Sequence, residues 1–383
     1  MDVAAYRDRF PILADTTYLI NHSLAAMPAA AEDRVLEYTR QWRTRGIRSW
    51  GEGWWDLPLT VGDQVGRIVG APPGTTCMHQ NVTVAMAVIL SCFRPEPPRN
   101  RIVYQEGEFP SVRYLLQAQP AAEIEVVPDL AALLDAIDER TLLVPLSHVL
   151  FKVAELQDVD AVQRRAQEAG AHVVLDAYQS AGAVPLDVQR LGVAFATGGS
   201  VKWLCGGPGA GWLYVRPDLI ERLEPTLVGW QGHARPFAFE PELEYADGIA
   251  RFLTGTPNVP ALFAATAGYD VIEELGVAAI RRRSLELTDH LIGRADAAGI
   301  EVTSQRDPSR RGASVSVRMP GFEGVHEELA ERQVLCDFRP EVGLRIGPHF
   351  YNTEEELDFT IAQIEEIVAS GAHERHPGAA ARF

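Results

Sequence analysis

Short apolar runs alternate with amphipathic stretches through the middle of the chain, from about residue 102 to residue 215. The runs are nearly continuous in apolar residues, which is typical of strands that are buried on both faces of a parallel sheet. Between them, Asp129–Ile137 and Asp158–Ala169 show helical spacing. The pattern predicts an α/β fold with a mostly parallel sheet and helices on both faces. The strands are expected at 102–104, 124–127, 142–146, 172–175, 193–196 and 212–215.

The C-terminal part of the chain follows a different pattern. Two long helical patterns lead into short apolar runs, and Thr353 with Glu356 forms a capping box before a last helix. This predicts a smaller α+β domain. The helices are expected at 259–275, 277–297 and 354–370, and the strands at 315–317, 334–336 and 344–346.

These patterns divide the chain into four parts. An N-terminal segment, residues 1–45, is expected to pack with the small domain. Residues 46–257 form the large domain and residues 258–370 the small C-terminal domain. The tail, residues 371–383, is rich in His, Pro and Ala and is expected to be disordered.

Composition and charge exclude several classes of function. The 383-residue chain has a formal net charge of −17, which argues against nucleic acid as a partner, because phosphate binding needs a cationic face. No apolar stretch reaches the ~20 residues that span a bilayer, and residues 1–8 do not resemble a signal peptide, so no membrane role is expected. The four cysteines are scattered without zinc-ligand spacing, so we expect no metal site and a cytoplasmic protein.

Lysine is scarce in this chain, and its distribution points to chemistry. Lys152 and Lys202 are the only lysines among 35 basic residues. A lysine amine can condense with an aldehyde, whereas arginine stays protonated. Lys202 lies between an apolar run and a glycine-rich segment, and Asp176 ends the preceding run, where ligands of parallel sheets bind.

An imine-forming lysine downstream of a strand-end aspartate is what pyridoxal 5′-phosphate (PLP) chemistry requires. The alternative interpretation is that both lysines are chance survivors on the surface and that Asp176 is a helix N-cap.

A longer set of motifs surrounds these two residues, and their order and spacing along the chain match those of a known family. The central motif runs from Asp176-Ala177-Tyr178-Gln179 to Gly199-Ser200-Val201-Lys202-Trp203. It resembles the class V aminotransferase group of fold-type I PLP enzymes, and within that group it looks most like kynureninase. The other matching segments are 18–24, 47–50, 108–111, 147–152, 229–233, 250–257 and 337–353.

The resemblance implies a role in cofactor binding for several residues. Lys202 would form the imine with PLP and then remove the Cα proton, and Asp176 would keep the pyridine nitrogen protonated. Gln179 would donate to the phenolic oxygen of the cofactor. Phe109 would stack on the ring, while Val82, Thr83 and Ser200 would hold the phosphate at a helix N-terminus. Trp230 and Thr256 would reach the phosphate from a neighbouring subunit, which implies a homodimer with the active site at its interface.

The resemblance also implies how an amino-acid substrate would bind. Arg345 would receive the α-carboxylate, because a planar guanidinium suits bidentate binding. Ser23 and Trp50 would shape the pocket for the substrate side chain. For Trp50, plain core packing is an equally good interpretation.

The chain departs from the kynureninase pattern where polar groups are expected near the cofactor. Val201 replaces a tyrosine, Gln179 replaces a histidine and Val112 replaces an aspartate. Leu150 and Phe151 replace an Asn-Tyr pair. A phenol at position 201 could assist proton transfer, which valine cannot do.

Three functional hypotheses therefore stay open. The leading one is kynureninase-like hydrolytic C–C cleavage of kynurenine or a related β-keto amino acid. The second is a class V aminotransferase or a β-eliminating lyase in a specialised biosynthetic pathway. The third is a catalytically silent PLP protein that serves as a ligand sensor or an assembly partner. A persulfide-forming desulfurase is disfavoured because Cys336 lies in an apolar run and not in a mobile loop.

Overall fold

The large domain is built around one twisted sheet. The structure is a computed structural model that describes residues 3–376. Its 7-stranded sheet has the order β2-β8-β7-β6-β5-β3-β4. Only β8 runs antiparallel to its neighbours, so the sheet is mostly parallel as predicted. The strands are β2 (Thr76–His79), β3 (Arg101–Gln105), β4 (Glu123–Val127), β5 (Thr141–Ser147), β6 (His172–Asp176), β7 (Phe195–Gly199) and β8 (Gly211–Val215).

Helices cover both faces of this sheet, and successive strand residues belong to different cores. Val173 and Leu175 pack in one hydrophobic cluster, whereas Val174 between them packs in the other. This is the two-residue alternation of a strand that is buried on both sides. The first face is covered by α3 (Leu57–Ile68), α6 (Leu130–Ala136), α7 (Val159–Ala169) and α8 (Val188–Leu191), and the second by α4 (Val82–Ser91) and α5 (Pro110–Gln117).

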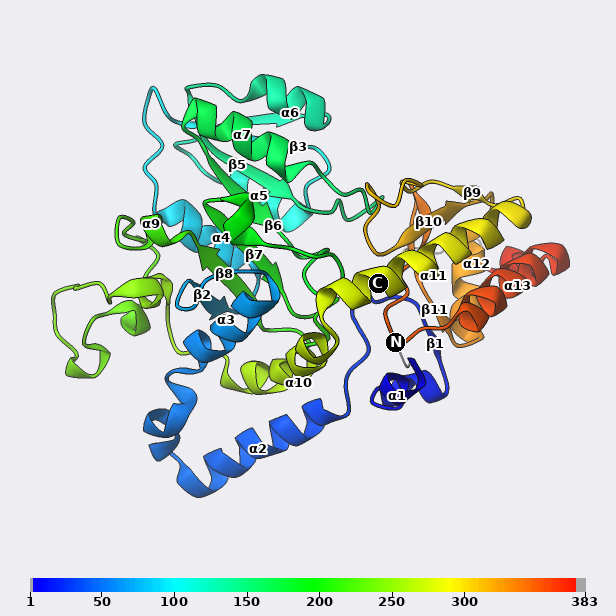
Figure 1. Ribbon diagram of the computed structural model, residues 1–383, viewed down its shortest axis with the longest axis horizontal. Coiled ribbons are helices and arrows are strands. Elements are labelled where there is room, and N and C mark those ends of the chain that lie inside the picture. Colours follow the sequence, from blue (N-terminus) through cyan, green and yellow to red (C-terminus); the bar gives the residue numbers. More distant parts are fainter. Residues whose placement is uncertain (1–2, 377–383) are drawn as a thin grey trace.

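The small domain lies beside the large one (Figure 1). Its 4-stranded antiparallel sheet has the order β12-β13-β10-β9. Two long helices, α10 (Val259–Leu275) and α11 (Val277–Ala297), run from the large domain to this sheet (Figure 1). The remaining elements are β9 (Glu301–Val302), β10 (Val315–Arg318), α12 (Phe322–Glu331), β11 (Val334–Leu335), β12 (Asp337–Arg339), β13 (Gly343–Ile346) and α13 (Glu354–Ser370).

The N-terminal segment contacts both domains. It contains α1 (Val3–Arg7), η1 (Pro11–Ala14), β1 (Thr17–Tyr18) and α2 (Ala30–Arg45). Strand β1 pairs in parallel with β11 of the small domain, and α2 packs against α10. The amide of Ala25 donates to the carbonyl of Val201 in the large domain (2.9 Å). The proposed domain limits, after residues 45 and 257, fall at the end of α2 and just before α10.

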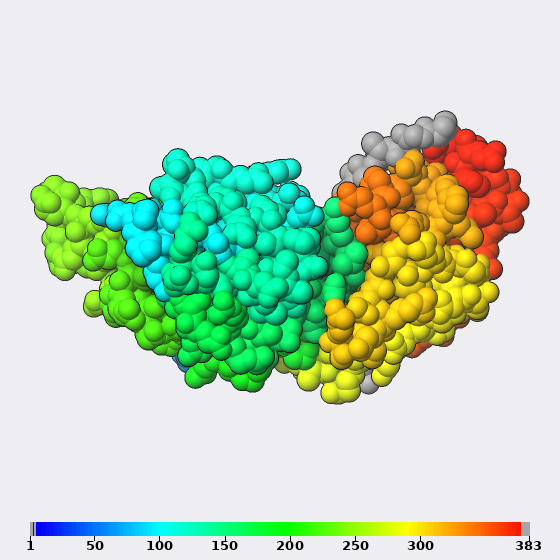
Figure 2. Space-filling view, turned by 90° about the horizontal axis from the view of Figure 1, so that it is seen from above, coloured from blue at the N-terminus to red at the C-terminus, as the bar shows by residue number. Residues whose placement is uncertain are grey.

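Short helical turns complete the large domain: η2 (Trp50–Trp54), α9 (Pro217–Ile220), η3 (Trp230–Gly232), η4 (Pro236–Ala238) and η5 (Gly248–Phe252). The space-filling view shows the segment around η4 projecting from the body of this domain (Figure 2). Among residues 3–376, no helix combines the length and the apolarity needed to cross a membrane.

Three details differ from the expectations. Strand β7 begins at Phe195 and not at Val193, because Gly192 first closes α8 in a left-handed conformation (φ 69°). The expected strand 334–336 is divided between β11 and β12 at Cys336. Part of the expected disordered tail is ordered, since η6 (Ala372–Arg375) follows α13 and both Arg375 and His376 pair with Glu328. Residues 377–383 lie outside the described residues.

Candidate active site

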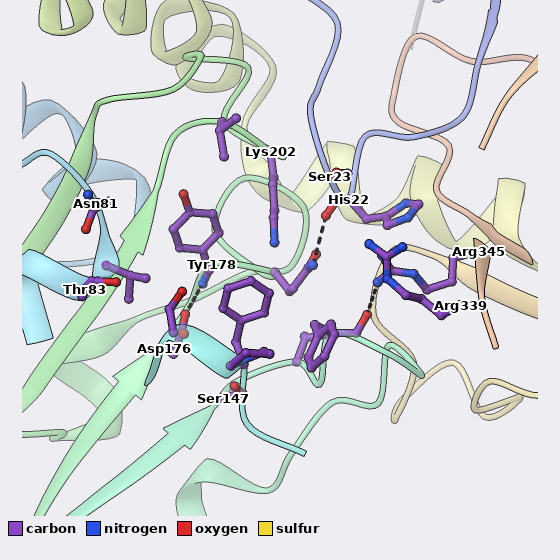
Figure 3. Close-up of a pocket in the computed structure, with 18 residues that line it drawn as sticks. His22, Ser23, Asn81, Thr83, Ser147, Asp176, Tyr178, Lys202, Arg339 and Arg345 are labelled. Atoms are coloured by element: carbon purple, nitrogen blue, oxygen red, sulfur yellow. Dashed lines mark hydrogen bonds between the residues drawn. The ribbon is translucent and has the colours of Figure 1, made fainter. Parts of the chain in front are cut away.

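A cavity of about 600 Å³ opens at the carboxyl ends of the parallel strands. Its walls come from the large domain, the small domain and the N-terminal segment (Figure 3). Eight of the residues predicted from the sequence line it: Ser23, Val82, Thr83, Phe109, Asp176, Gln179, Lys202 and Arg345. The structure thus brings together most of the site that the motifs predict.

Lys202 follows β7 and extends its amine into this cavity (Figure 3). Its Nζ lies 4.7 Å from the ring centre of Tyr178 and 5.6 Å from that of Phe109. Desolvation lowers the pKa of the amine to about 8, although the negative charge of Asp176 acts in the opposite direction. Lys202 is therefore more readily deprotonated than an exposed lysine. Lys152, in contrast, forms an ion pair with Glu341 at the surface.

Asp176 is the last residue of β6 and is buried. Burial raises the pKa of its carboxyl group to about 6, while a backbone hydrogen bond from Tyr178 (2.8 Å) and the charge of Lys202 act against that rise. A buried carboxylate with one amide donor is stabilised by a cationic N–H partner. The protonated pyridine nitrogen of PLP is such a partner, so the residue fits the predicted role.

The N-terminus of α4 forms another wall of the cavity. The side chain of Asn81 caps the helix by accepting from the amide of Val84 (3.1 Å). The amides of Val82 and Thr83 belong to the first turn, where a helix dipole favours an anion. A Cβ on Gly211 of β8 would lie 2.7 Å from the Cα of Asn81, so glycine there permits the close approach of β8. This wall suits a phosphate dianion.

The amide of Gln179 is held in one orientation by two buried partners. The indole of Trp203 donates to Gln179 Oε1 (3.2 Å), and Gln179 Nε2 donates to the carbonyl of His22 (3.0 Å). An indole N–H can only donate and a carbonyl can only accept, so a flipped amide would lose both bonds. The amide nitrogen of Gln179, which carries two N–H donors, is therefore fixed in position, as its predicted hydrogen bond to the phenolic oxygen of PLP requires.

Arg345 is held by the small domain and by the loop after β5. Its Nε donates to Asp337 Oδ2 (2.7 Å), its Nη2 bonds to the same oxygen, and its Nη1 bonds to the carbonyl of Phe151. These bonds leave a further N–H on each terminal nitrogen, enough for one carboxylate. Burial alone would raise the pKa of Asp337, but the nearby imidazole of His22 (Nε2 to Oδ2, 3.7 Å) and the charge of Arg345 lower it to about 2.

Four predicted residues do not line the cavity. The hydroxyl of Ser200 donates to the carbonyl of Ala210 (2.6 Å) and contacts the hydroxyl of Tyr269, and its role toward the phosphate stays a prediction. Trp50 and Thr256 line a separate hollow beside α2. Trp230 packs edge-on against Trp55, with ring centres 4.8 Å apart. The roles of Trp230 and Thr256 toward a neighbouring subunit stay predictions.

Several cavity residues lie within the matching motifs but had no predicted role. Tyr178, His22 and Arg339 line the cavity, as do Ser111 and Ser147. Behind Ser147 lies the buried Glu108, which accepts from the amide (2.8 Å) and contacts the hydroxyl (2.6 Å) of that serine. Desolvation raises the pKa of Glu108 to about 8. Position alone could have indicated Ser147, since it ends β5 just as Asp176 ends β6.

Comparison of the amino-acid sequence with known proteins identifies relatives that match most of the chain. Residues 17–358 match the family model described as aminotransferase class-V. A kynureninase from Pseudomonas fluorescens is 32% identical over 96% of this chain and 92% of that protein. A kynureninase from Burkholderia pseudomallei is 33% identical over 90% of this chain and 87% of that protein.

Solved structures with a similar fold are more distant in sequence. An apo cysteine desulfurase from Thermococcus onnurineus has a TM-score of 0.84 at 21% identity, and the match covers 96% of this chain and 98% of that one. A variant of C-DES with glycine linked covalently to its PLP cofactor has a TM-score of 0.86 at 21% identity, covering 94% of this chain and 99% of that one. At this identity the likeness concerns the fold alone.

The environment of Lys202 predicts how its reaction with PLP depends on pH. Only the neutral amine attacks an aldehyde, so covalent loading should accelerate about tenfold per pH unit up to about pH 8 and level off above it. The measurement is the growth of visible cofactor absorbance after the apoprotein is mixed with PLP between about pH 6 and about pH 10.

Two variants serve as controls for this profile. Lys152→Arg should keep it, because Lys152 is a surface residue, and Lys202→Arg should give no covalent absorbance. A rate that rises steadily to about pH 10, as expected for an exposed lysine, would contradict the assignment.

Proposed function

The chain belongs to the class V aminotransferase family, and on that premise we propose that it catalyses kynureninase-like hydrolytic C–C cleavage of kynurenine or a related β-keto amino acid. It is a PLP-dependent enzyme with the fold-type I architecture. The observation that carries the proposal is the similarity to kynureninases over nearly the whole chain. The arrangement of Lys202, Asp176 and Arg345 around one cavity supports it.

The residues of this chain can prepare an α-amino acid for reaction. When bound, PLP supplies an electron sink for the charge that develops at the substrate Cα. The two remaining N–H groups of Arg345 orient the carboxylate, and Lys202, with a pKa of about 8, can take the Cα proton near neutral pH. Asp176 would pair with the pyridine nitrogen as a carboxylate, and Gln179, whose amide orientation is fixed by Trp203, would donate to the phenolic oxygen.

A second candidate function is transamination or β-elimination by the same groups. It is favoured by the apolar wall next to Lys202, where Val201, Val149 and Phe151 line the cavity. These side chains cannot activate water, whereas hydrolysis requires an activated water molecule. Transamination and β-elimination do not need a water molecule to attack a ketone. Both begin with a proton transfer by Lys202, β-elimination also expels the β-substituent, and water then hydrolyses the imine that remains.

Turnover of kynurenine tests the proposal directly. Purified, PLP-loaded protein is mixed with L-kynurenine and with 3-hydroxykynurenine, and the cofactor absorbance and the aromatic product are followed together. We expect anthranilate or its hydroxy form with alanine, and no product from Lys202→Ala. A spectral change without an aromatic product would reject C–C hydrolysis. Keto-acid acceptors and β-substituted amino acids would then be the substrates to test.

The binding of the substrate carboxylate by Arg345 predicts a specific kinetic defect. Arg345→Lys keeps the positive charge but loses the planar fork of donors, so we expect KM to rise by about tenfold to hundredfold with a smaller change in kcat. The matched control is Arg318→Lys, which should be neutral. Arg318 lies on the neighbouring strand β10 and forms an exposed ion pair with Glu301 of β9. Equal KM values for the wild type and Arg345→Lys would refute this role.

We propose a homodimer whose interface includes the hollow beside α2. Trp42 and Ile47 at that hollow are 62% and 82% exposed, and Phe239 in the projecting segment is 74% exposed. Large apolar side chains gathered in this way are typical of interaction surfaces.

We also propose that the protein is cytoplasmic, since all four cysteines are free thiols.

Sedimentation tests the dimer. The wild type should sediment with twice the mass of the 42.0 kDa chain. Ile47→Glu should shift the protein toward the monomer, because a charge would be buried in the interface. Phe359→Glu, at a 45% exposed position on α13, is the control and should stay dimeric. A monomeric wild type would reject the proposal.

A further inference from the structure

Tyr178 is the closest aromatic neighbour of the Lys202 amine, although no predicted role was assigned to it. The centre of its ring lies 4.7 Å from Lys202 Nζ, nearer than the ring of Phe109 at 5.6 Å. Its own amide donates to Asp176 Oδ1 (2.8 Å). Tyr178 is thus fixed between the two residues that bind opposite ends of a pyridine ring.

The ring of Tyr178 occupies space that a side chain at position 199 would need. A Cβ on Gly199 would lie 2.3 Å from Cζ, 2.4 Å from Cε2 and 2.5 Å from the hydroxyl of Tyr178. Gly199 does not have a positive φ, so room, and not backbone conformation, requires glycine here. Tyr178 and Gly199 therefore form a matched pair, in which the last residue of β7 makes space for the phenol.

The hydroxyl of Tyr178 is a donor at neutral pH. Desolvation raises its pKa to about 12, and the negative charge of Asp176 acts in the same direction. The hydroxyl groups of Ser200 and Tyr269 are bonded to each other, and that of Ser200 also donates to the carbonyl of Ala210. In the part of the chain that the structure describes, Tyr178 shares the cavity with the N-terminus of α4 and lies between Thr83 and Lys202 (Figure 3).

We propose that Tyr178 binds the cofactor in two ways: its ring packs against the pyridine ring, and its hydroxyl donates to the phosphate. The aromatic ring supplies a face beside the amine to which the cofactor is attached. A phenol O–H and the helix N-terminus together provide donors to a dianion. This role goes beyond the proposed function, because it depends on the cofactor and not on the reaction that follows.

Two ligands and two variants separate the ring from the hydroxyl. The dissociation constants of PLP and of pyridoxal, which lacks the phosphate, are measured by absorbance with each apoprotein. Tyr178→Phe keeps the packing, so it should weaken PLP about tenfold and leave pyridoxal unchanged. Tyr178→Ala removes the ring as well as the hydroxyl. It should weaken the binding of pyridoxal about fivefold and that of PLP about fivefold more than Tyr178→Phe does.

Each half of the role can be overturned separately. Unchanged PLP affinity in Tyr178→Phe would remove the hydroxyl from the phosphate site. Unchanged pyridoxal affinity in Tyr178→Ala would remove the ring contact. No amino-acid substrate is present, so a failure of kynurenine turnover leaves these outcomes unaffected.

A double-variant cycle tests the pairing with Gly199. Gly199→Ala should weaken PLP at least about tenfold in the wild-type background, because the new Cβ displaces the phenol. In the Tyr178→Ala background the same change should have little effect. Gly293→Ala, at a helical glycine with open space around it, is the control and should bind PLP normally. Equal effects of Gly199→Ala in both backgrounds would refute the pairing.

Discussion

The attraction between Asp176 and Lys202 inside a desolvated cavity is the interaction on which the site depends. Each group alone would lose its charge on burial, since desolvation raises the pKa of one and lowers that of the other. The charge of each group also favours the charged form of the other, and so shifts the pKa of the other back toward its ordinary value. The balance leaves pKa values of about 6 and about 8, so both groups remain functional near neutral pH. The parallel register of β6 and β7, which sets Asp176 beside Thr197, brings the two groups into one cavity.

Backbone carbonyl groups connect the three parts of the chain at this site. The carbonyl of His22 in the N-terminal segment accepts from Gln179, and the carbonyl of Trp203 accepts from His349 of the small domain (3.0 Å). The carbonyl of Phe151 in the large domain accepts from Arg345. Gln179 and Arg345, which would face the cofactor and the substrate, are thus each supported from another part of the chain. The relative position of the parts therefore controls the direction of the donors.

The strands and the central pair could be predicted from the sequence, because a strand buried on both faces leaves a continuous apolar run and a strand end marks the ligand side of a parallel sheet. Motifs also identified Phe109, Gln179 and Arg345. The directions of side chains could not be predicted in this way. Ser200 belongs to the central motif, yet its hydroxyl turns to β8, because Ala210 and Tyr269 satisfy it there. Asp337 was visible only as the first residue of a matching motif, since its role comes from Arg345 across the antiparallel pair β12–β13.

The groups around Lys202 also limit how a reaction can proceed. Tyr178, with a pKa of about 12, can donate a proton but is a poor base, and burial lowers the pKa of His22 to about 4. Glu108 is bonded to Ser147 behind the cavity. Lys202 is therefore the effective base among the described residues that line the cavity.

Hydrolysis would require this one amine to act twice, first at the substrate Cα and then at a water molecule. Transamination would require it to move one proton from the substrate Cα to a carbon of the cofactor, and water would then have to hydrolyse the imine that remains. Both reactions thus consume water, but only C–C hydrolysis needs it to attack a ketone, and Val201 and Phe151 beside Lys202 carry no group that could activate it for that step.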